Sequence, residues 1–261
     1  MSKEVFPIFK QCCHPQEVWG LRRLCLQLAP ELVEFLDPAK DTEALKFILD
    51  FLQVSLKKQS SSADSGASAE KWVRVQAMQN FGQIVHACHL KNEKRQLSGK
   101  INEVCRFFYD LEFLKAEKVN IQAEDSFMSD DESEKIKEMW AFHMPCVLLV
   151  QKSEFWPTLK QIYQEIYTDI AVPVKRSLAA SFLEITKLHL DEQFMTPVLQ
   201  SFATSPVEEV RQKVYPHLIP YIKLTTQNQL QLVQTLIKPL LDEKPEKPSF
   251  KHSVARASLL E

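Results

Sequence analysis

Histidine and cysteine side chains are the first candidates for chemistry in this sequence of 261 residues. His86, Cys88 and His89 lie close together, and the two histidines share a face if the segment is helical. A structural zinc site needs a second ligand pair at short spacing, and none follows. We therefore interpret Cys88 as a core cysteine and the histidines as surface or lightly buried residues. His143 and Cys146 are interpreted in the same way.

A Cys-Cys-His run at 12–14 suggests a redox or nucleophilic thiol. Such a thiol needs a pKa lowered by a nearby cation or by a helix N-terminus, and the sequence indicates neither. The six cysteines form no CxxC pair and stand mostly among apolar residues. This pattern is typical of reduced core thiols in a cytosolic or nuclear protein. The sequence predicts no catalytic residue, no bound metal and no cofactor, and hence no enzyme.

A basic cluster of Lys91, Lys94, Arg95 and Lys100 is a candidate phosphate contact. Glu93 dilutes its charge, and no aromatic residues are interleaved to stack on bases. The chain as a whole has 32 basic and 34 acidic residues, a net charge of -2, which gives no general attraction to nucleic acid or anionic membrane. We expect a solvated turn here and neither nucleic acid nor membrane as a partner.

Glycine content and hydropathy exclude further classes. With only four glycines, Gly-rich phosphate loops are nearly excluded and an all-helical chain is favoured. The N-terminus MSKEVFPIFK lacks the features of a secretory signal, and no apolar run is long enough to span a membrane. We expect a soluble protein of the cytoplasm or the nucleus.

One phrase recurs along the chain. DIAVPVKRSLAASFLEITKL at 169–188 is followed 36 residues later by the looser SPVEEVRQKVYPHLIPYIKL at 205–224. Related starts, a β-branched residue followed by a basic one, occur at Val73 and Ile136, and the start at Ile136 precedes that at Val174 by 38 residues. The period is close to the roughly 40 residues of two-helix repeats.

Each start leads into an amphipathic helix. Val174, Leu178, Phe182 and Ile185, for example, are spaced to lie on one buried face. A similar stripe begins at Val18. The first helices of the repeats are predicted at 4–13, 41–57, 95–117, 155–168, 191–203 and 226–242.

Three prolines, Pro197, Pro216 and Pro239, fall inside predicted helices. A proline in a helix interior removes a hydrogen bond and clashes with the preceding turn. We expect kinks or local breaks at these positions.

Two polar insertions interrupt the spacing. Residues 58–70 are Ser-rich and predict a flexible loop. Residues 119–135 are acidic and predict a disordered loop up to a helix that starts near Ser133. Within it, Ser126 and Ser129 stand among acidic residues, a pattern similar to acidophilic kinase sites. Phosphorylation would favour capture by a basic partner, and a plain solvated spacer is the alternative.

The fold predicted from these features is all-α. We expect a right-handed α-solenoid of about six two-helix repeats over 1–261, with two polar loop insertions. The chain ends at ARASLLE, within an apolar-faced helix, although a stack needs a polar terminal unit. We therefore expect a piece, or a short version, of a longer array.

An acidic residue followed six positions later by a basic one recurs before the helices, as Asp131 with Lys137 and Asp169 with Lys175. Ser205 with Arg211, and Ser68 with Arg74, keep only the basic half. This pattern is similar to the HEAT consensus, in which such pairs form a ladder between neighbouring repeats.

A narrower resemblance covers about 137–224. Phe142 with Pro145, then Trp156, then Val174 with the following Lys-Arg, occur in an order that resembles protein phosphatase 4 regulatory subunit 1 and, more distantly, the protein phosphatase 2A scaffold. The resemblance implies a non-catalytic subunit that binds the catalytic subunit of such a phosphatase and directs its substrate choice.

The turns between paired helices line one ridge of a solenoid, and such ridges are common docking surfaces. We call the candidate partner-binding residues the turn ridge. They are Asp169, Val172, Pro173, Lys175, Arg176, Pro206, Glu208 and Arg211. For Asp169 and Lys175 a structural role in the ladder is the alternative.

A second hypothesis is a transport or assembly adaptor of the importin or condensin kind. Such a protein would bind a peptide or helix on its concave face. The residues expected to do so are Trp72, Phe81 and Phe182, on the second helices of the repeats.

Overall fold

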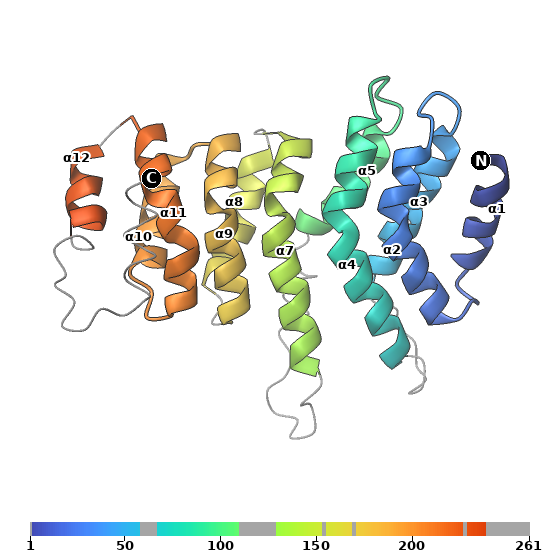
Figure 1. Ribbon diagram of the computed structural model, residues 1–261, viewed down its shortest axis with the longest axis horizontal. Helices are drawn as coiled ribbons and strands as arrows, with labels where there is room; N and C mark the ends of the chain where they lie inside the picture. Colours follow the sequence, from blue (N-terminus) through green and yellow to red (C-terminus); the bar gives the residue numbers. More distant parts are fainter. Residues whose placement is uncertain are drawn as a thin grey trace. The chain divides into compact units, whose positions relative to one another are not determined.

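The computed structural model describes residues 2–57, 67–109, 129–152, 155–168, 171–226 and 229–238. Over these ranges the chain forms helices and no strand, which confirms the all-α prediction. It divides into two compact units, Met1–Gln151 and Lys152–Glu261, and each is described by itself (Figure 1).

The first unit consists of two layers of helices. One layer contains α2 (Trp19–Phe35), α4 (Ala67–Leu90) and α7 (Ser129–Gln151), of which α4 packs against both others (Figure 1). The second layer contains α1 (Ser2–Cys12), α3 (Thr42–Leu56) and α5 (Ser98–Cys105), which is followed by a 3-10 turn, η1 (Arg106–Tyr109). Two phenylalanine pairs join α1 to α3, Phe6 with Phe47 and Phe9 with Phe51.

The second unit has the same arrangement of helices. One layer contains α9 (Val172–Leu188) packed against α11 (Glu208–Leu224). The other contains α8 (Trp156–Tyr167) and α10 (Glu192–Ala203), joined by three edge-on pairs of aromatic rings. The short α12 (Gln229–Leu232) continues as a π-helix, η3 (Val233–Ile237). Polar contacts between neighbouring helices of a layer join residues 31 to 35 positions apart, close to the 36-residue period of the sequence.

Two helices begin earlier than predicted. α4 starts at Ala67 and α7 at Ser129, so the last residues of the predicted loops at 58–70 and 119–135 are helical. The start of α7 thus precedes the helix start predicted near Ser133.

Prolines inside helices do not interrupt them. α10 and α11 continue through Pro197 and Pro216, so the predicted local breaks are wrong, while Pro239 lies outside the described residues. In α2, Pro30 has no N–H to donate to the carbonyl of Leu26. That carbonyl instead accepts from Asn80 Nδ2 of α4 at 2.7 Å. A contact from the neighbouring helix thus replaces the bond that the proline removes.

Lys91, which directly follows α4, binds the end of α2. Its Nζ donates to the carbonyls of Glu34 at 2.9 Å and Leu36 at 2.7 Å. The last carbonyls of a helix have no partner within it, and a cation there interacts favourably with the helix dipole. Together with Asn80, Lys91 connects α4 to the main chain of α2 near its middle and at its end.

Gly82 of α4 lies directly against His143 of α7. A Cβ atom at Gly82 would stand 2.4 Å from Nδ1 of His143, so only glycine fits without movement. The imidazole is buried, and burial lowers the pKa of His143 to about 4. Cys146 Sγ also donates to the Gly82 carbonyl, at 3.4 Å. This close approach explains a glycine in the middle of a long helix.

Two buried tyrosines of the second unit differ in one hydrogen bond. The hydroxyl of Tyr163 is buried without a hydrogen-bond partner among the described residues, and burial raises the pKa of Tyr163. The hydroxyl of Tyr221 shares a hydrogen bond of 2.6 Å with Thr196 Oγ1. A buried polar group without a partner destabilises the folded state.

We predict opposite effects of removing these hydroxyls. Tyr163→Phe should raise the free energy of unfolding by about 1 kcal/mol, because it removes an unsatisfied polar group. Tyr221→Phe should lower it by about 1 kcal/mol, because it leaves Thr196 without its partner. Urea denaturation of both variants measures the difference. Equal losses in the two would mean that the Tyr163 hydroxyl is satisfied in solution.

Candidate partner-binding surface

The two turns that carry the turn ridge end at the first residues of α9 and α11. Pro173 occupies the second position of α9, where a missing N–H costs nothing. Glu208 and Glu209 form the first turn of α11, where their charge suits the positive end of the helix dipole. Local sequence therefore fixes where each turn stops and its helix starts.

An ion pair brings the two turns together. Arg176 Nη1 lies 3.1 Å from Glu209 Oε2, which joins the start of α9 to the start of α11. The side chains are 38% and 61% exposed, so solvent screens the pair and it contributes only about 0–1 kcal/mol to stability. The packing of α9 against α11 brings the two turns to one surface, and the ion pair joins them there.

Arg211 supports the second turn from within α11. Its Nη1 donates to the main-chain carbonyl of Ser205. The six-residue spacing that suggested a ladder thus corresponds here to a contact with the backbone of the turn. Pro206, next to this carbonyl, is exposed.

The remaining residues of the turn ridge have different environments. Val172, Pro173 and Lys175 are half-buried at the start of α9. Glu208 Oε1 accepts from Gln212 Nε2 of its own helix at 2.7 Å. Asp169 lies outside the described residues. The ridge is thus described for seven of its eight predicted members.

Glu209 is the residue that sequence reasoning missed. The predicted ladder pairs residues six positions apart, whereas the observed ion pair between Arg176 and Glu209 joins residues 33 positions apart. This separation is just under one sequence repeat. A search for opposite charges one full period apart would have missed it, because Gln212 stands 36 residues after Arg176.

The first unit contains a comparable contact between successive helices of one layer. Arg22, in the first turn of α2, pairs with Glu70 near the start of α4. Arg22 is only 2% exposed, so this pair is buried on the arginine side. Beside it, Arg23 Nε donates to Gln76 Oε1 at 3.1 Å. An arginine near one helix start thus binds a glutamate near the next helix start in both units.

The residues expected on a concave binding face do not form one. Phe81 and Phe182 are fully buried, whereas Trp72 is 38% exposed. Phe81 packs on Phe108 with ring centroids 4.6 Å apart, and Phe182 packs on Tyr221 at 5.4 Å. These two phenylalanines belong to the core, and a partner cannot reach them. The prediction of binding through them is therefore wrong.

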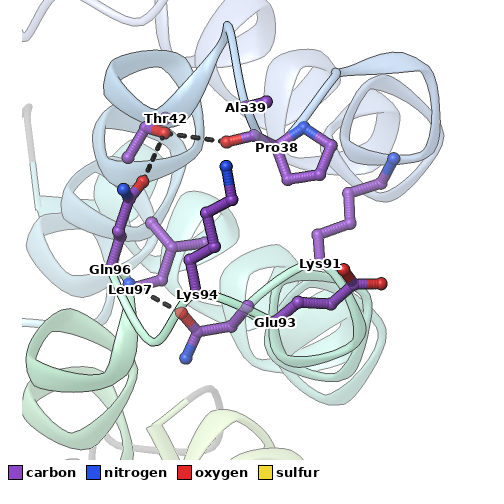
Figure 2. Close-up of a pocket in the computed structure, with 9 residues that line it drawn as sticks. Pro38, Ala39, Thr42, Lys91, Glu93, Lys94, Gln96 and Leu97 are labelled. Atoms are coloured by element: carbon purple, nitrogen blue, oxygen red, sulfur yellow. Dashed lines mark hydrogen bonds between the residues drawn. The ribbon is translucent and has the colours of Figure 1, made fainter.

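The residues of the basic cluster make contacts with different parts of the structure. Lys91 and Lys94 line a cavity of about 90 Å³ between the turn after α2 and the turn after α4; Lys94 extends towards Pro38 and Thr42, whereas Lys91 lies on the other side of Pro38 (Figure 2). Lys91 is engaged with the end of α2, as described above. Thr42 Oγ1 donates to the carbonyl of Pro38 at 2.8 Å and so closes the opposite wall (Figure 2).

Lys100 points to other partners. It pairs with Asp50 and, at 2.7 Å, with Glu103, and the bond to Asp50 is the main cause that raises the pKa of Lys100. Arg95 has a positive φ of 57° in the turn. The four basic residues therefore do not form a single phosphate-binding surface.

The histidine and cysteine candidates also have different environments. Cys88 is buried, which raises the pKa of its thiol to about 12. His86 lines a cavity of about 430 Å³ between α2 and α4, together with Glu31 and Glu34. In the part of the chain that the structure describes, no group of three or more His, Cys, Asp or Glu could hold a metal ion.

The two candidate phosphorylation sites are only partly described. Ser126 lies outside the described residues, and Ser129 is the first residue of α7, although its side chain is not described.

None of the described helices is both long and apolar enough to cross a membrane. Comparisons of the chain with protein-family models, with curated proteins and with solved structures find no match.

Proposed function

We propose that the chain is a non-catalytic HEAT-type scaffold, or regulatory subunit, that binds the catalytic subunit of a protein phosphatase of the 2A or 4 type. The two-layer packing in each unit and the near-36-residue contact spacing support a right-handed solenoid of about six repeats. The phosphatase partner rests on the resemblance of residues 137–224. We place this role in the cytoplasm or the nucleus.

One observation carries the choice of surface, the contact between Arg176 and Glu209. It aligns the turns before α9 and α11, so that residues from two successive repeats face the same partner. Pro206 is exposed beside it, and Lys175 is half-buried next to Arg176. Rigid helices behind each turn limit how far these groups can move, which favours a preorganised binding surface.

The proposed mechanism is positioning. The turn ridge holds the catalytic subunit, and the rest of the helical stack determines which substrates reach its active site. Charged groups at the rim of an interface mainly set the association rate and the choice of partner. We therefore expect Lys175 and Arg176 to select an acidic region of the partner.

Charge reversal at the turn ridge tests this function. The variant Lys175→Glu with Arg176→Glu should reduce the affinity for a purified phosphatase catalytic subunit at least about tenfold, because two attractive charges become repulsive. Biolayer interferometry at two salt concentrations measures the loss. The effect should shrink at high salt, because salt screens exposed charges.

The matched control reverses two lysines at the other ends of the same helices. Lys187→Glu with Lys223→Glu makes the same change in net charge on exposed residues of the last turns of α9 and α11. We expect its affinity to stay within about twofold of the unmodified chain. An equal loss in both variants would refute the turn ridge, and no binding by the unmodified chain would refute the phosphatase partner.

A further inference from the structure

A groove opens to solvent between α1 and α3 of the first unit. It encloses about 460 Å³, within the range of about 300–1,000 Å³ that small-molecule sites occupy. The turn after α1 contributes to its wall through His14. Phe6 with Phe47, and Phe9 with Phe51, hold α1 on α3 beside it. The groove is therefore built from two helices that pack on each other.

Both walls repeat with the period of a helix. The groove is lined at positions 7, 10, 11 and 14 on one side and at 47, 50, 51 and 54 on the other. The amides of Cys13 and His14 still donate to carbonyls in the last turn of α1, so position 14 continues that helix. Residues three, four and seven apart share one helix face, and seven residues rise about 10 Å. An extended chain advances about 1.2 Å per bond, so about eight carbons span this length.

The α3 wall of the groove is largely apolar. It is formed by Phe47, Phe51 and Val54. Phe51 is buried and Val54 is 44% exposed, so the apolar wall reaches from the core to solvent. A groove of similar size between α2 and α4 has Glu31 and Glu34 in its wall instead. Because apolar surface gains free energy when it leaves water, an aliphatic chain fits the groove between α1 and α3 better.

A cation stands over this apolar wall. Lys10 Nζ lies 5.6 Å from the centroid of the Phe47 ring, where the ring attracts the ammonium group. No ion pair within the described part of the first unit involves Lys10. Asp50, the acidic residue of the α3 wall, is paired with Lys100 of α5. The groove thus offers an ammonium group to a ligand, while its carboxylate is already engaged.

His14 supplies a hydrogen-bond donor on the same wall as Lys10. The main-chain N–H of Gln16 donates to His14 Nδ1 at 3.3 Å. A neutral imidazole that accepts at Nδ1 carries its proton on Nε2, so Nε2 is left as a donor. Lys10 and His14 are four residues apart, a spacing at which two side chains of a helix are neighbours. One carboxylate can therefore bind both groups.

We propose that this groove binds a free fatty acid, with its carboxylate on Lys10 and His14 and its aliphatic chain along α3. The chain would contact Phe47, Phe51 and Val54. Hydrogen bonds between charged groups are shorter and stronger than neutral ones, so the carboxylate fixes which way the ligand lies. This inference does not depend on the phosphatase partner, because the groove is in the first unit and the turn ridge is in the second.

A bound fatty acid would connect α1 to α3. A ligand that binds only the closed groove stabilises that form by a factor of one plus the ratio of free ligand to Kd. At a free concentration of ten times the Kd, opening of α1 away from α3 should therefore become about tenfold rarer. Hydrogen exchange reports such local opening.

The test titrates the full chain, labelled with nitrogen-15, with octanoate, whose eight carbons match the length of the groove. The NMR shifts of the backbone amides should saturate with a Kd of about 1 mM or below, and the largest shifts should fall in α1 and α3. Octanol has the same chain without the charge and should bind about tenfold more weakly. Hydrogen exchange in α1 should slow by about tenfold at ten times the Kd.

Matched variants locate the site. Lys10→Met removes the charge and should lower the affinity for octanoate to about that for octanol, whereas Lys223→Met, at an exposed lysine of the second unit, should leave it unchanged. Val54→Trp fills the groove and should abolish binding. Val5→Trp is its control, because Val5 is 43% exposed and lies outside the lining of the groove.

Three results would overturn the proposal. One is that no amide shift saturates below the concentration at which octanoate forms micelles. Another is that octanol binds as tightly as octanoate, which would indicate a groove for an uncharged apolar group, such as a side chain of a partner protein. The third is that Lys10→Met and Val54→Trp bind octanoate as the unmodified chain does. The comparison of octanoate with octanol uses the unmodified chain, so it decides the matter even if a variant fails to fold.

Discussion

Gly82→Ala is expected to lower the free energy of unfolding of the first unit by about 2 kcal/mol, although alanine is the better helix former. The added methyl would stand 2.4 Å from Nδ1 and 3.1 Å from Cε1 of His143. The imidazole is buried and has Phe81 and Phe142 as ring neighbours, so it has little room to move. Overpacking of this kind costs about 1–3 kcal/mol, more than the gain of up to about 1 kcal/mol in helix propensity.

Two matched glycines separate packing from propensity. Gly20 in α2 and Gly99 in α5 have no atom within 4 Å of an added Cβ. Gly20→Ala and Gly99→Ala should therefore leave stability unchanged or raise it by less than about 1 kcal/mol. Urea denaturation gives the total effect, and hydrogen exchange along α4 and α7 locates it.

A change of the neighbour tests the cause. In a His143→Ala background the space beside Gly82 is open, so adding Gly82→Ala should cost almost nothing further. If Gly82→Ala were as harmful there as in the unmodified chain, contact with His143 would not be the reason for the glycine.

Glu70→Ala is expected to lower the free energy of unfolding by about 3 kcal/mol, the largest effect that we predict for a single side chain. The substitution removes the carboxylate that pairs with Arg22. Arg22 is 2% exposed, and its Nε already has no hydrogen-bond partner among the described residues. Removing one member of a buried pair costs about 3–5 kcal/mol, and the lower end applies because Glu70 itself is 31% exposed.

The control is an ion pair in solvent. Glu43 lies 2.8 Å from Lys46 on α3 and is 86% exposed. Glu43→Ala should change stability by less than about 1 kcal/mol, because exposed pairs contribute little. A similar loss in both variants would mean that burial of Arg22 does not determine the cost.

A double-mutant cycle with Arg22→Met completes this experiment. Methionine has a similar length and no charge, so Glu70→Ala should become nearly neutral once Arg22→Met is present. Additive losses would show that the two residues act independently. The cycle thus distinguishes an unpaired charge from a general effect on the start of α4.

The helices were predictable because each one follows from local spacing. The stripe through Val174, Leu178 and Phe182 indicates one buried face, and all three residues are fully buried. The start of α7 was predicted too late, near Ser133 instead of Ser129, because the acidic composition was taken as a sign of disorder.

The contacts between helices were much less predictable. Arg22 and Glu70 are 48 residues apart, and no local pattern pairs them. In the candidate surface, the sequence predicted the turns. It did not predict the role of Glu209, since that role depends on how α11 packs beside α9.

The hydrogen bonds from α4 to the backbone of α2 have a consequence for sequence variation. Asn80 and Lys91 bind carbonyls at Leu26, Glu34 and Leu36, and a carbonyl is present whatever side chain a residue carries. Mutations along this part of α2 can therefore accumulate without loss of these bonds. The register of the two helices therefore depends on the donor side chains. A single change at Asn80 would leave the Leu26 carbonyl without a hydrogen-bond donor, because Pro30 has no N–H. Related chains, if aligned on this helix pair, should thus differ more freely at these carbonyl positions than at the donors Asn80 and Lys91.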